Sequence, residues 1–366
     1  MSDCNHNYCV IMAGGIGSRF WPISRLSRPK QFLDFTSSGK SFLRLTFDRI
    51  KKVIPEQNIL IVTLTRYREL VMRQIPELLP ENLILEQYNR NTAPAITYAT
   101  YTLLKRDPQA VMVATPSDLV INRHDMFELT LANALEFAAG SDALITLGVV
   151  PTRPDPNFGY IQAVGDLGSD KPLPVKTFTE KPDAELAKVF VESGEFLWNS
   201  GMFVWKATYI RKELERHAPQ ITNLWEGWES ALGTAEESAF VQRIYDSDLP
   251  RISIDYAVME KTSNAWVYPA KFKWADIGNW DSLYEYLSHH DALGNASSIE
   301  GSRMIRDCSN NVVYSAGRTH RLTAINGLND FILIDTDEVL LICPRDEQKL
   351  KDFLSELARP EFEEFR

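Results

Sequence analysis

The sequence contains few cysteines, and none of them has the spacing of a zinc site or a disulfide framework. Its four cysteines, Cys4, Cys9, Cys308 and Cys343, form no CxxC pair, and its six histidines form no HExxH pattern. These spacings supply the usual ligands of protein-bound zinc. We therefore expect reduced thiols and no zinc site.

A long hydrophobic run is also absent. No stretch of about 18 apolar residues, the length that crosses a bilayer, occurs in the sequence. Residues 1–7 lack the basic region and the apolar stretch of a signal peptide. These absences predict a cytoplasmic protein with no membrane partner.

Positive charge is in deficit, because 39 Lys and Arg residues stand against 49 Asp and Glu residues, a net charge of −10. An acidic protein repels nucleic acid, so we expect no nucleic-acid partner. Any anionic ligand must then be met by a local basic cluster or by a metal ion.

Material for a large core is present. Hydrophobic residues make up 44% of the 366 residues, with 8 Trp, 13 Tyr and 18 Phe, which is enough for a well-packed interior. Domains commonly contain roughly 100–200 residues, so the length favours a main domain with an appendage.

Apolar runs rich in Val, Ile and Leu alternate with amphipathic helical stretches over the first 150 residues. Such runs are typical of strands buried on both faces, and the helices between them imply right-handed crossovers. The pattern predicts a three-layer α/β fold with a mostly parallel sheet and ligands at the carboxyl ends of the strands. The expected strands are Tyr8–Ala13, Ile59–Thr63, Ala110–Ala114 and Ala143–Val149, and the expected helices are Ser41–Lys52, Arg66–Gln74, Ala95–Lys105 and Met126–Ala139.

The pattern changes near Pro151, where Pro and Gly clusters interrupt short strands. We expect a second lobe over residues 151–290, and from about residue 300 a small β appendage that closes with a helix at Glu347–Ala358. The expected strands of these parts are Tyr160–Val164, Pro174–Thr179, Asn311–Ser315, Arg321–Ile325, Asp330–Asp335 and Val339–Cys343.

A glycine-rich turn, Gly14-Gly15-Ile16-Gly17, follows the first expected strand. Glycines let backbone N–H groups approach phosphate oxygens, although such a turn by itself is equally compatible with a structural role. It is not a P-loop, and Phe20 breaks the Rossmann fingerprint, which leaves a nicotinamide dehydrogenase as a weak alternative.

The next segment, Arg19–Phe32, carries a concentration of Arg and Lys together with Phe20 and Trp21. Basic density beside a glycine turn suits a triphosphate, whereas a solvated charged loop would carry fewer aromatic residues. The whole signature, Gly-Gly-x-Gly-x-Arg-x-Trp-Pro-x-Ser-Arg-x-x-x-Pro-Lys-Gln-Phe, resembles that of the mannose-1-phosphate guanylyltransferases in the sugar nucleotidyltransferase superfamily.

The resemblance implies a Rossmann-like, GT-A-like fold and assigns a nucleotide site. Thr92 as an N-cap and Pro94 in the first turn of a helix could explain the Arg-Asn-Thr-Ala-Pro-Ala motif by capping alone, but the resemblance places this motif near the base and ribose. Gln87, Tyr88 and Asn89 stand where the family more often has a Pro and a Gly. The residues implied to contact the nucleotide are Gly14, Gly15, Gly17, Arg19, Lys30, Arg90, Asn91, Thr92, Pro116 and Ser117.

Two carboxylates are implied to hold Mg²⁺. Asp118 lies after an expected strand, where turn chemistry is the ordinary explanation, and the segment resembles the family's Pro-x-Asp-His-x-Ile motif with Leu119 in place of His. Asp276 lies in a stretch that resembles Trp-x-Asp-x-Gly-x-Trp, in which Asn279 is expected to cap the next helix and Asp281 to complement its positive end.

Three shorter motifs resemble the family's sugar side in their order. Gly159 would lie against the sugar ring, Glu180 and Asn199 would bind sugar hydroxyls, and Lys181 would bind the sugar phosphate. Taken singly, the Glu180–Lys181 pair is compatible with an ordinary surface ion pair, and Asn-Ser-Gly with an ordinary turn.

The implied reaction is GTP plus α-mannose 1-phosphate giving GDP-mannose and pyrophosphate, with Arg19, Lys30 and Lys181 as the catalytic cations. The implied domains are a catalytic domain over residues 1–290, with its nucleotide half at about 1–150, and a left-handed β-helix-like appendage over 300–366 that forms a homodimer. Another nucleotide or hexose phosphate, or a noncatalytic sugar-nucleotide sensor, remain alternatives. Isomerase activity is not expected.

Overall fold

The computed structural model describes residues 6–15, 17–36, 38–272, 274–287, 290–299, 302–315 and 322–365. The chain forms two compact units, each built from several segments. The first comprises residues 1–14, 43–117 and 121–274, and the second comprises residues 15–42, 118–120 and 275–366. Cys4 lies outside the described residues, while Cys9, Cys308 and Cys343 are buried and form no disulfide.

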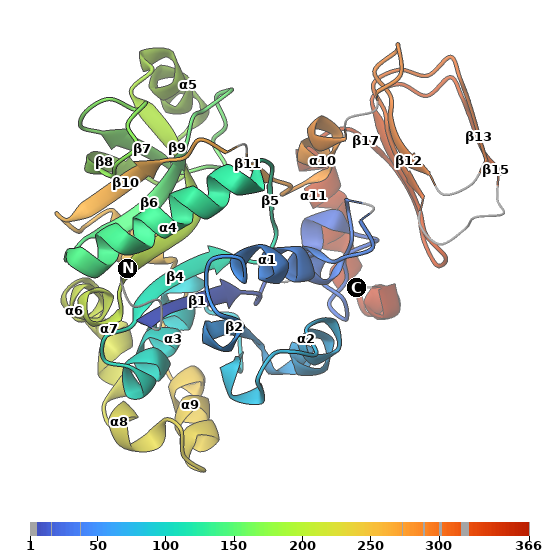
Figure 1. Ribbon diagram of the computed structural model, residues 1–366. Coiled ribbons are helices and arrows are strands. Elements are labelled where there is room, and N and C mark those ends of the chain that lie inside the picture. The colour runs from blue at the N-terminus through green and yellow to red at the C-terminus, as the bar shows by residue number, and fades with distance from the viewer. Residues whose placement is uncertain are drawn as a thin grey trace. The chain divides into compact units, whose positions relative to one another are not determined.

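The first unit is built on a nine-stranded sheet with the strand order β3-β2-β1-β4-β9-β6-β10-β8-β7 (Figure 1). β1 pairs in parallel with β2 and β4, and β2 pairs in parallel with β3, as crossover connections require. The strands are β1 (Asn7–Met12), β2 (Ile59–Leu64), β3 (Leu83–Glu86), β4 (Val111–Pro116), β6 (Leu144–Val149), β7 (Tyr160–Ala163), β8 (Leu173–Thr179), β9 (Phe196–Lys206) and β10 (Ala265–Pro269).

The sheet is mixed, because β9 lies antiparallel between β4 and β6, and β8 lies antiparallel to both β10 and β7. The expected parallel strands formed, but the sequence analysis did not predict β9 between them. β9 is buried along most of its length, but its run contains Asn199, Ser200 and Gly201 and lacks the Val, Ile and Leu enrichment of the parallel strands, so the apolar pattern did not mark it.

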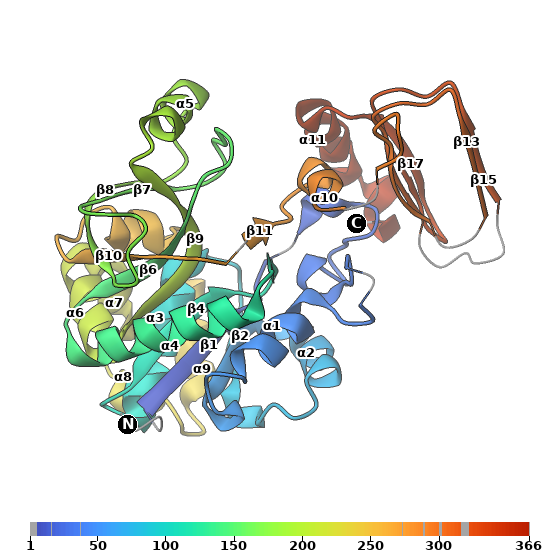
Figure 2. The same cartoon turned by 45° about the horizontal axis from the view of Figure 1, so that its top comes forward.

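Helices cover both faces of this sheet, which confirms the predicted α/β class. α4 packs against β4, β6 and β9, whereas α3 packs against β1 and β3 and also contacts α6 (Figure 2). Two further strands, β5 (Leu119–Ile121) and β11 (Trp274–Asp276), pair separately. The helices are α1 (Phe42–Ile50), α2 (Arg68–Gln74), α3 (Thr92–Arg106), α4 (His124–Gly140), α5 (Ala184–Ser193), α6 (Ala207–His217), α7 (Pro219–Thr222), α8 (Trp228–Ala231) and α9 (Glu237–Asp246).

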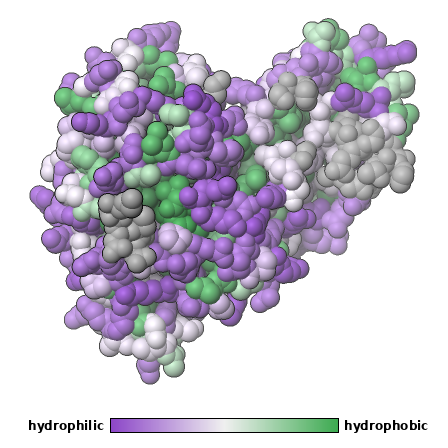
Figure 3. All heavy atoms as spheres, viewed as in Figure 1, coloured by the Kyte–Doolittle hydropathy of each residue, from purple (hydrophilic) through white to green (hydrophobic). Residues whose placement is uncertain are grey.

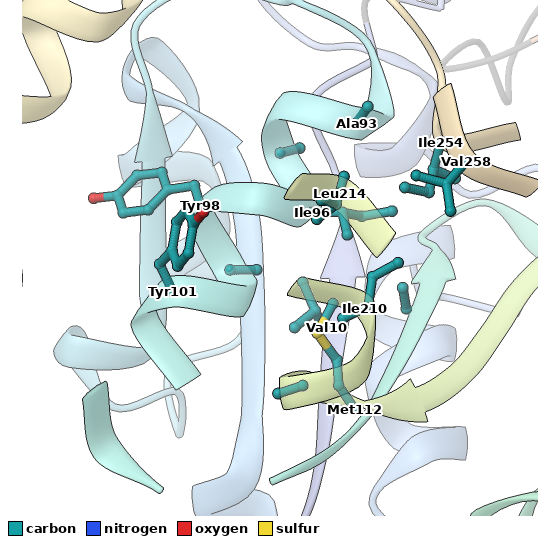
Figure 4. Packing of buried hydrophobic residues seen from close by; sticks show 14 of the residues in the cluster. Val10, Ala93, Ile96, Tyr98, Tyr101, Met112, Ile210, Leu214, Ile254 and Val258 are labelled. Carbon is teal, nitrogen blue, oxygen red and sulfur yellow. The ribbon is translucent and has the colours of Figure 1, made fainter. Parts of the chain in front are cut away.

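The largest hydrophobic cluster lies between the sheet and the α3–α6 layer. Figure 4 shows Ile96 of α3 beside Leu214 of α6, with Val10 of β1 and Met112 of β4 close by. All four side chains are fully buried. This packing fixes α3, whose N-terminus begins at the motif that resembles the nucleotide site.

The second unit contains the C-terminal strands. β12, β14 and β16 pair in parallel, β17 pairs antiparallel to β16, and β13 pairs in parallel with β15. Its elements are α10 (Trp280–Tyr286), β12 (Ala296–Ile299), β13 (Ser302–Arg306), β14 (Val312–Ser315), β15 (Leu322–Asn326), β16 (Phe331–Asp335), β17 (Leu340–Pro344) and α11 (Glu347–Ser355).

The basic signature segment packs within this second unit. Phe20 and Phe35 lie in one cluster with Trp280 and Ile332, and Trp21 Nε1 donates a hydrogen bond to the Phe365 carbonyl at 2.6 Å. Arg25 also forms an ion pair with Glu338. The aromatic residues of the signature therefore form a hydrophobic core with strands about 300 positions later in the chain.

The face of the molecule in Figure 3 is largely hydrophilic, with hydrophobic residues dispersed over it. Among the helices of the described residues, none combines the length and the apolar composition that spanning a bilayer demands.

Candidate active site

Gly14 begins the glycine turn after β1 and lies against a buried carboxylate. The Gly14 carbonyl accepts a hydrogen bond from Asn89 Nδ2 at 2.9 Å. A Cβ added to Gly14 would lie 3.2 Å from Glu86 Oε2, so the backbone approaches this carboxylate closely because there is no side chain. A side chain at position 14 would therefore press on the Glu86 carboxylate, so packing favours glycine here independently of any phosphate.

Glu86 is a buried acid at the end of β3 that sequence reasoning missed. Tyr245 Oη donates a hydrogen bond to Glu86 Oε1 at 2.7 Å, across 159 positions of sequence. Burial raises the pKa of Glu86 to about 8, although the hydrogen bond from Tyr245 opposes this shift. No local pattern marks the pair, because Tyr245 comes from the helical segment after β9.

The pKa of Glu86 predicts how stability depends on pH. Between about pH 4.5, its ordinary pKa, and pH 8, the unfolded chain releases this proton while the folded chain keeps it, so the wild type loses stability as pH rises. Glu86→Gln keeps the acceptor for Tyr245 but has no proton to lose. The variant should gain on the order of 2–4 kcal/mol in unfolding free energy relative to wild type between pH 5 and pH 8.

Urea unfolding of both proteins at the two pH values measures this difference. A difference between the proteins that is the same at both pH values would contradict the raised pKa of Glu86.

The Arg90-Asn91-Thr92 motif begins α3, but its capping differs from the prediction. Asn91, at a φ of 69°, is the N-cap, and its side chain accepts from the Thr92 N–H at 2.9 Å. Thr92 is instead the first helical residue, and its hydroxyl accepts from the Ile254 N–H at 2.9 Å. The buried Nε of Arg90 has no hydrogen-bond partner among the described residues. Asn91 replaces Thr92 as the cap because it tolerates a positive φ better than a β-branched residue.

Pro116 is the last residue of β4, beside the end of β1, and Ser117 follows it. The Ser117 N–H donates to the Met12 carbonyl at 3.2 Å, and the Ser117 carbonyl accepts from the Thr46 hydroxyl at 3.1 Å. Both backbone groups are thus occupied by protein, and Ser117 is buried.

In the second unit, Lys30 and Asp118 form an ion pair with Lys30 Nζ 2.7 Å from Asp118 Oδ2. Lys30 is buried, and its ammonium group lies 5.8 Å from the centre of the Phe20 ring. The Gly15 carbonyl accepts from Gln31 Nε2 at 2.8 Å. The structure therefore brings a signature cation, a glycine of the turn and a predicted metal ligand together.

Gly17 is required by the same cluster. Its φ is +64°, and an added Cβ would lie 2.7 Å from Lys30 Cβ. A side chain at this position would clash with Lys30 and strain the backbone. Arg19, by contrast, is exposed.

Asp276, the second predicted metal ligand, is the last residue of β11. β11 pairs with β5, the strand that begins directly after Asp118. The side chain of Asp276 lies outside the description. Among the described residues there is no group of three or more His, Cys, Asp or Glu side chains placed to hold a metal. A magnesium ion there would draw its other oxygen ligands from phosphate and water, as it does in nucleotide sites.

The predictions for the neighbours of Asp276 are confirmed. Asn279 caps α10, accepting from the Ser282 N–H at 2.8 Å while its own N–H donates to Ser282 Oγ at 3.0 Å. Asp281 lies in the first turn of α10 and forms an ion pair with Arg345.

The four residues of the predicted sugar side lie together in the first unit. The Asn199 N–H donates to the Gly159 carbonyl at 2.8 Å, and Lys181 Nζ lies 3.1 Å from Glu180 Oε1. A Cβ on Gly159 would lie 2.4 Å from Glu180 Oε2 and 3.1 Å from Asn199 Cβ. The Glu180 side chain is only 9% exposed, whereas the Lys181 side chain is 57% exposed, so the ion pair joins a buried carboxylate to a lysine that reaches solvent.

Two further acids belong to this cluster and were missed by sequence reasoning. Asp255 begins a π-helical turn, Asp255–Met259, and its Oδ1 accepts from Asn199 Nδ2 at 2.8 Å. Glu260 Oε1 accepts from the Glu180 N–H at 2.9 Å. Both lie in a segment without strand or helix periodicity, so only the tertiary structure identifies them.

The pKa of Glu180 reflects this surplus of acids. Burial, with a smaller contribution from the negative charge of Asp255, raises it to about 7, and the Lys181 ammonium and the Asn199 amide oppose both effects. The pKa of Asp255 is also raised, chiefly by burial. Such a cluster of perturbed acids around one cation is typical of a binding site for a polar ligand.

A family model described as nucleotidyl transferase matches residues 8–292 of this chain. The chain belongs to the nucleotidyl transferase family. The match covers all the predicted site residues in both units.

Named relatives show which members of the family this chain is similar to. The chain is 36% identical to a mannose-1-phosphate guanylyltransferase from Escherichia coli K12, over 92% of this chain and 70% of that protein. It is 35% identical to the mannose-1-phosphate guanylyltransferase RfbM of Salmonella typhimurium, over 97% of this chain and 74% of that protein. The same identity, over 95% of this chain and 72% of the relative, relates it to the xanthan biosynthesis protein XanB of Xanthomonas campestris.

Solved structures agree with the fold. A mannose-1-phosphate geranyltransferase from Thermus thermophilus superposes with a TM-score of 0.83 at 28% identity, over 97% of this chain and all of the other. A mannose-6-phosphate isomerase from Helicobacter pylori has a TM-score of 0.59 at 30% identity, over 74% of this chain and 99% of the other.

Proposed function

We propose that this protein transfers GMP from GTP to α-D-mannose 1-phosphate, giving GDP-mannose and pyrophosphate. The observation that carries the proposal is the sequence identity of 35–36%, over more than nine-tenths of this chain, to two mannose-1-phosphate guanylyltransferases. The cluster of Glu180, Lys181 and Asn199 around Gly159 supports it, because it offers one cation for a phosphate and several polar groups for hydroxyls.

In this reaction an oxygen of the sugar phosphate attacks the α-phosphorus of the nucleotide, and the bond from that phosphorus to the bridging β-phosphate oxygen breaks. The nucleophile is already an anion, so the protein needs no general base. Lys181 orients the sugar phosphate, and Lys30 with Arg19 stabilises the departing pyrophosphate. Glu180 and Asn199 bind sugar hydroxyls beside Gly159.

The nucleotide site uses the glycine turn and the start of α3. Backbone groups of the turn approach the phosphates, and the motif at the start of α3 lies near the base and ribose. We assign Gly14, Gly15, Gly17, Pro116, Ser117, Arg90, Asn91 and Thr92 to this site.

Magnesium fits the oxygen donors of Asp118 and Asp276, which are hard ligands at the ends of two paired strands. When bound, the ion would offset the charge of the triphosphate, which an acidic protein with a net charge of −10 neutralises poorly. Lys30, which contacts Asp118, would hold this carboxylate in place.

We further propose that residues 1–290 form the catalytic domain and that the C-terminal strands form a short β-helix used in a homodimer. Leu340 and Ile342 are more than half exposed on β17, at the edge of its sheet, which is a surface suited to self-association. Light scattering at micromolar concentration should show a dimer. A stable monomer would contradict this part. We place the enzyme in the cytoplasm, where its buried thiols stay reduced.

The deciding experiment is pyrophosphate release by the purified protein with Mg²⁺ and mannose 1-phosphate, comparing GTP, ATP, UTP, CTP and dTTP. The best nucleotide is then tested with glucose 1-phosphate. Preference for GTP with mannose 1-phosphate supports the proposal, and preference for another pair moves the specificity while keeping the chemistry. Tight binding of GDP-mannose without turnover would favour a sensor instead.

A further inference from the structure

The amide of Asn199 is fixed in one orientation by a backbone donor. Its Oδ1 accepts from the Gly201 N–H at 3.1 Å and from the Thr146 hydroxyl at 2.9 Å. A backbone N–H cannot accept a hydrogen bond, so the oxygen must lie at this end of the amide, and the nitrogen must lie at the other. Toward Asp255 and Glu180, Asn199 therefore presents only its donor group.

Asp255 holds the nitrogen end of that amide. Asn199 Nδ2 donates one hydrogen to Asp255 Oδ1 at 2.8 Å. Its second hydrogen is directed toward Glu180, because the Asn199 amide lowers the pKa of that carboxyl and so favours its ionised form. Glu180 uses Oε1 for Lys181, whereas its buried Oε2 has no hydrogen-bond partner among the described residues. A donor and an unsatisfied acceptor thus lie side by side.

The position of Asp255 is set by the start of α3. The Ile254 N–H donates to the Thr92 hydroxyl at 2.9 Å, and the Ile252 carbonyl accepts from the Ala93 N–H at 3.1 Å. Two hydrogen bonds on successive residues of α3 therefore anchor the residues just before Asp255. The acid cannot drift without breaking contacts of a buried helix.

We propose that Asp255 is a positioning residue of the hexose site, which keeps Asn199 as a donor beside the acceptor Oε2 of Glu180 so that one sugar hydroxyl satisfies both. A hydroxyl suits this pair because it accepts and donates at once. The inference rests on the proposed function and deepens it, because it adds a residue that the sugar motifs do not contain.

The charge of Asp255 gives the proposal a second readout. Besides Asp255, the charged or titratable groups that face Glu180 are Lys181, Glu260 and Tyr256. Binding a hydroxyl as its acceptor favours ionised Glu180, so affinity for the sugar phosphate should rise with pH through the pKa of Glu180, about 7. Removing the negative charge of Asp255 should lower that pKa and shift the profile to lower pH.

Two substitutions separate the hydrogen bond from the charge. Asp255→Ala removes both, and it should raise KM for mannose 1-phosphate roughly tenfold to a hundredfold while KM for GTP stays within about threefold. Asp255→Asn keeps an oxygen acceptor for Asn199, so its KM at pH 8 should stay within about threefold, and the acid limb of its kcat/KM profile should move to lower pH.

The substrate phosphate titrates identically with every variant, so differences between profiles belong to the protein. Glu192→Gln, which removes an exposed acid of α5 that pairs only with Lys188 among the described residues, is the control and should match wild type in both readouts.

An unchanged KM for mannose 1-phosphate in Asp255→Ala would overturn the inference. An Asp255→Asn variant that loses affinity as severely as the alanine variant, with no shift of its profile, would overturn it as well, and this test remains if the alanine variant fails to fold. A wild-type protein inactive with mannose 1-phosphate would instead overturn the proposed function, so the two failures are distinguishable.

Discussion

Replacing Asp118 or Asp276 with Asn is expected to lower kcat by about a hundredfold to a thousandfold, because each substitution removes a charged oxygen ligand where phosphate charge must be offset. Asparagine preserves the volume of each side chain, and both residues lie in the second unit at the ends of paired strands. Turnover measured across a magnesium titration should show both a lower maximum and a weaker dependence on the ion.

The matched control is Asp281→Asn, five positions after Asp276 in the same unit, which forms an ion pair with Arg345 and has no assigned role in phosphate binding. It should retain near-normal turnover. Near-normal turnover of Asp118→Asn or Asp276→Asn at ordinary magnesium concentrations would refute the corresponding metal assignment, provided that the thermal unfolding of the variant matches that of wild type.

The second large effect is expected for Gly159→Ala, which should raise KM for mannose 1-phosphate about tenfold to a hundredfold and leave KM for GTP nearly unchanged. The added Cβ would lie 2.4 Å from Glu180 Oε2 and 3.1 Å from Asn199 Cβ. The Glu180 carboxylate is the far end of a flexible side chain, so it can move aside. The fold should survive, but the acceptor for the sugar would be displaced.

Gly140→Ala at the end of α4 is the control, because nothing lies within 4 Å of its added Cβ. Steady-state kinetics with each substrate varied in turn measure both variants. If Gly159→Ala weakened GTP and mannose 1-phosphate equally, the residue would act through the fold rather than through the sugar site.

The local sequence pattern was sufficient to predict the strands and helices whose burial is regular along their length. β1, β2, β4 and β6 are short Val-, Ile- and Leu-rich runs, and each formed within one or two residues of its expected bounds. α3 and α4 formed near their expected positions for the same reason, because helical periodicity depends on the nearest residues alone. The capping role of Asn279 also follows from local chemistry, since Asn before a helix satisfies its first N–H groups.

The local pattern did not predict features that depend on residues distant in the sequence. An apolar run does not reveal the direction of its neighbours, so β9 between β4 and β6 was not foreseen. The Thr92 hydroxyl, which was expected to cap α3, instead accepts from the Ile254 N–H, 162 positions later, and Asn91 is the cap. Glu86 carries no motif, and its partner Tyr245 is a long way along the chain.

The sequence by itself determined the α/β class, the glycine turn with its basic segment, and the order of motifs that marks a sugar nucleotidyltransferase. These features are local, since each depends on periodicity, backbone freedom or side-chain type within a few residues. Only the tertiary structure decided that the signature segment packs with the C-terminal strands, that Lys30 contacts Asp118, and that Asp255 joins Asn199 and Glu180. Hydrophobic burial and hydrogen bonding select such partners by proximity in space, and local spacing does not reveal which distant residue the partner is.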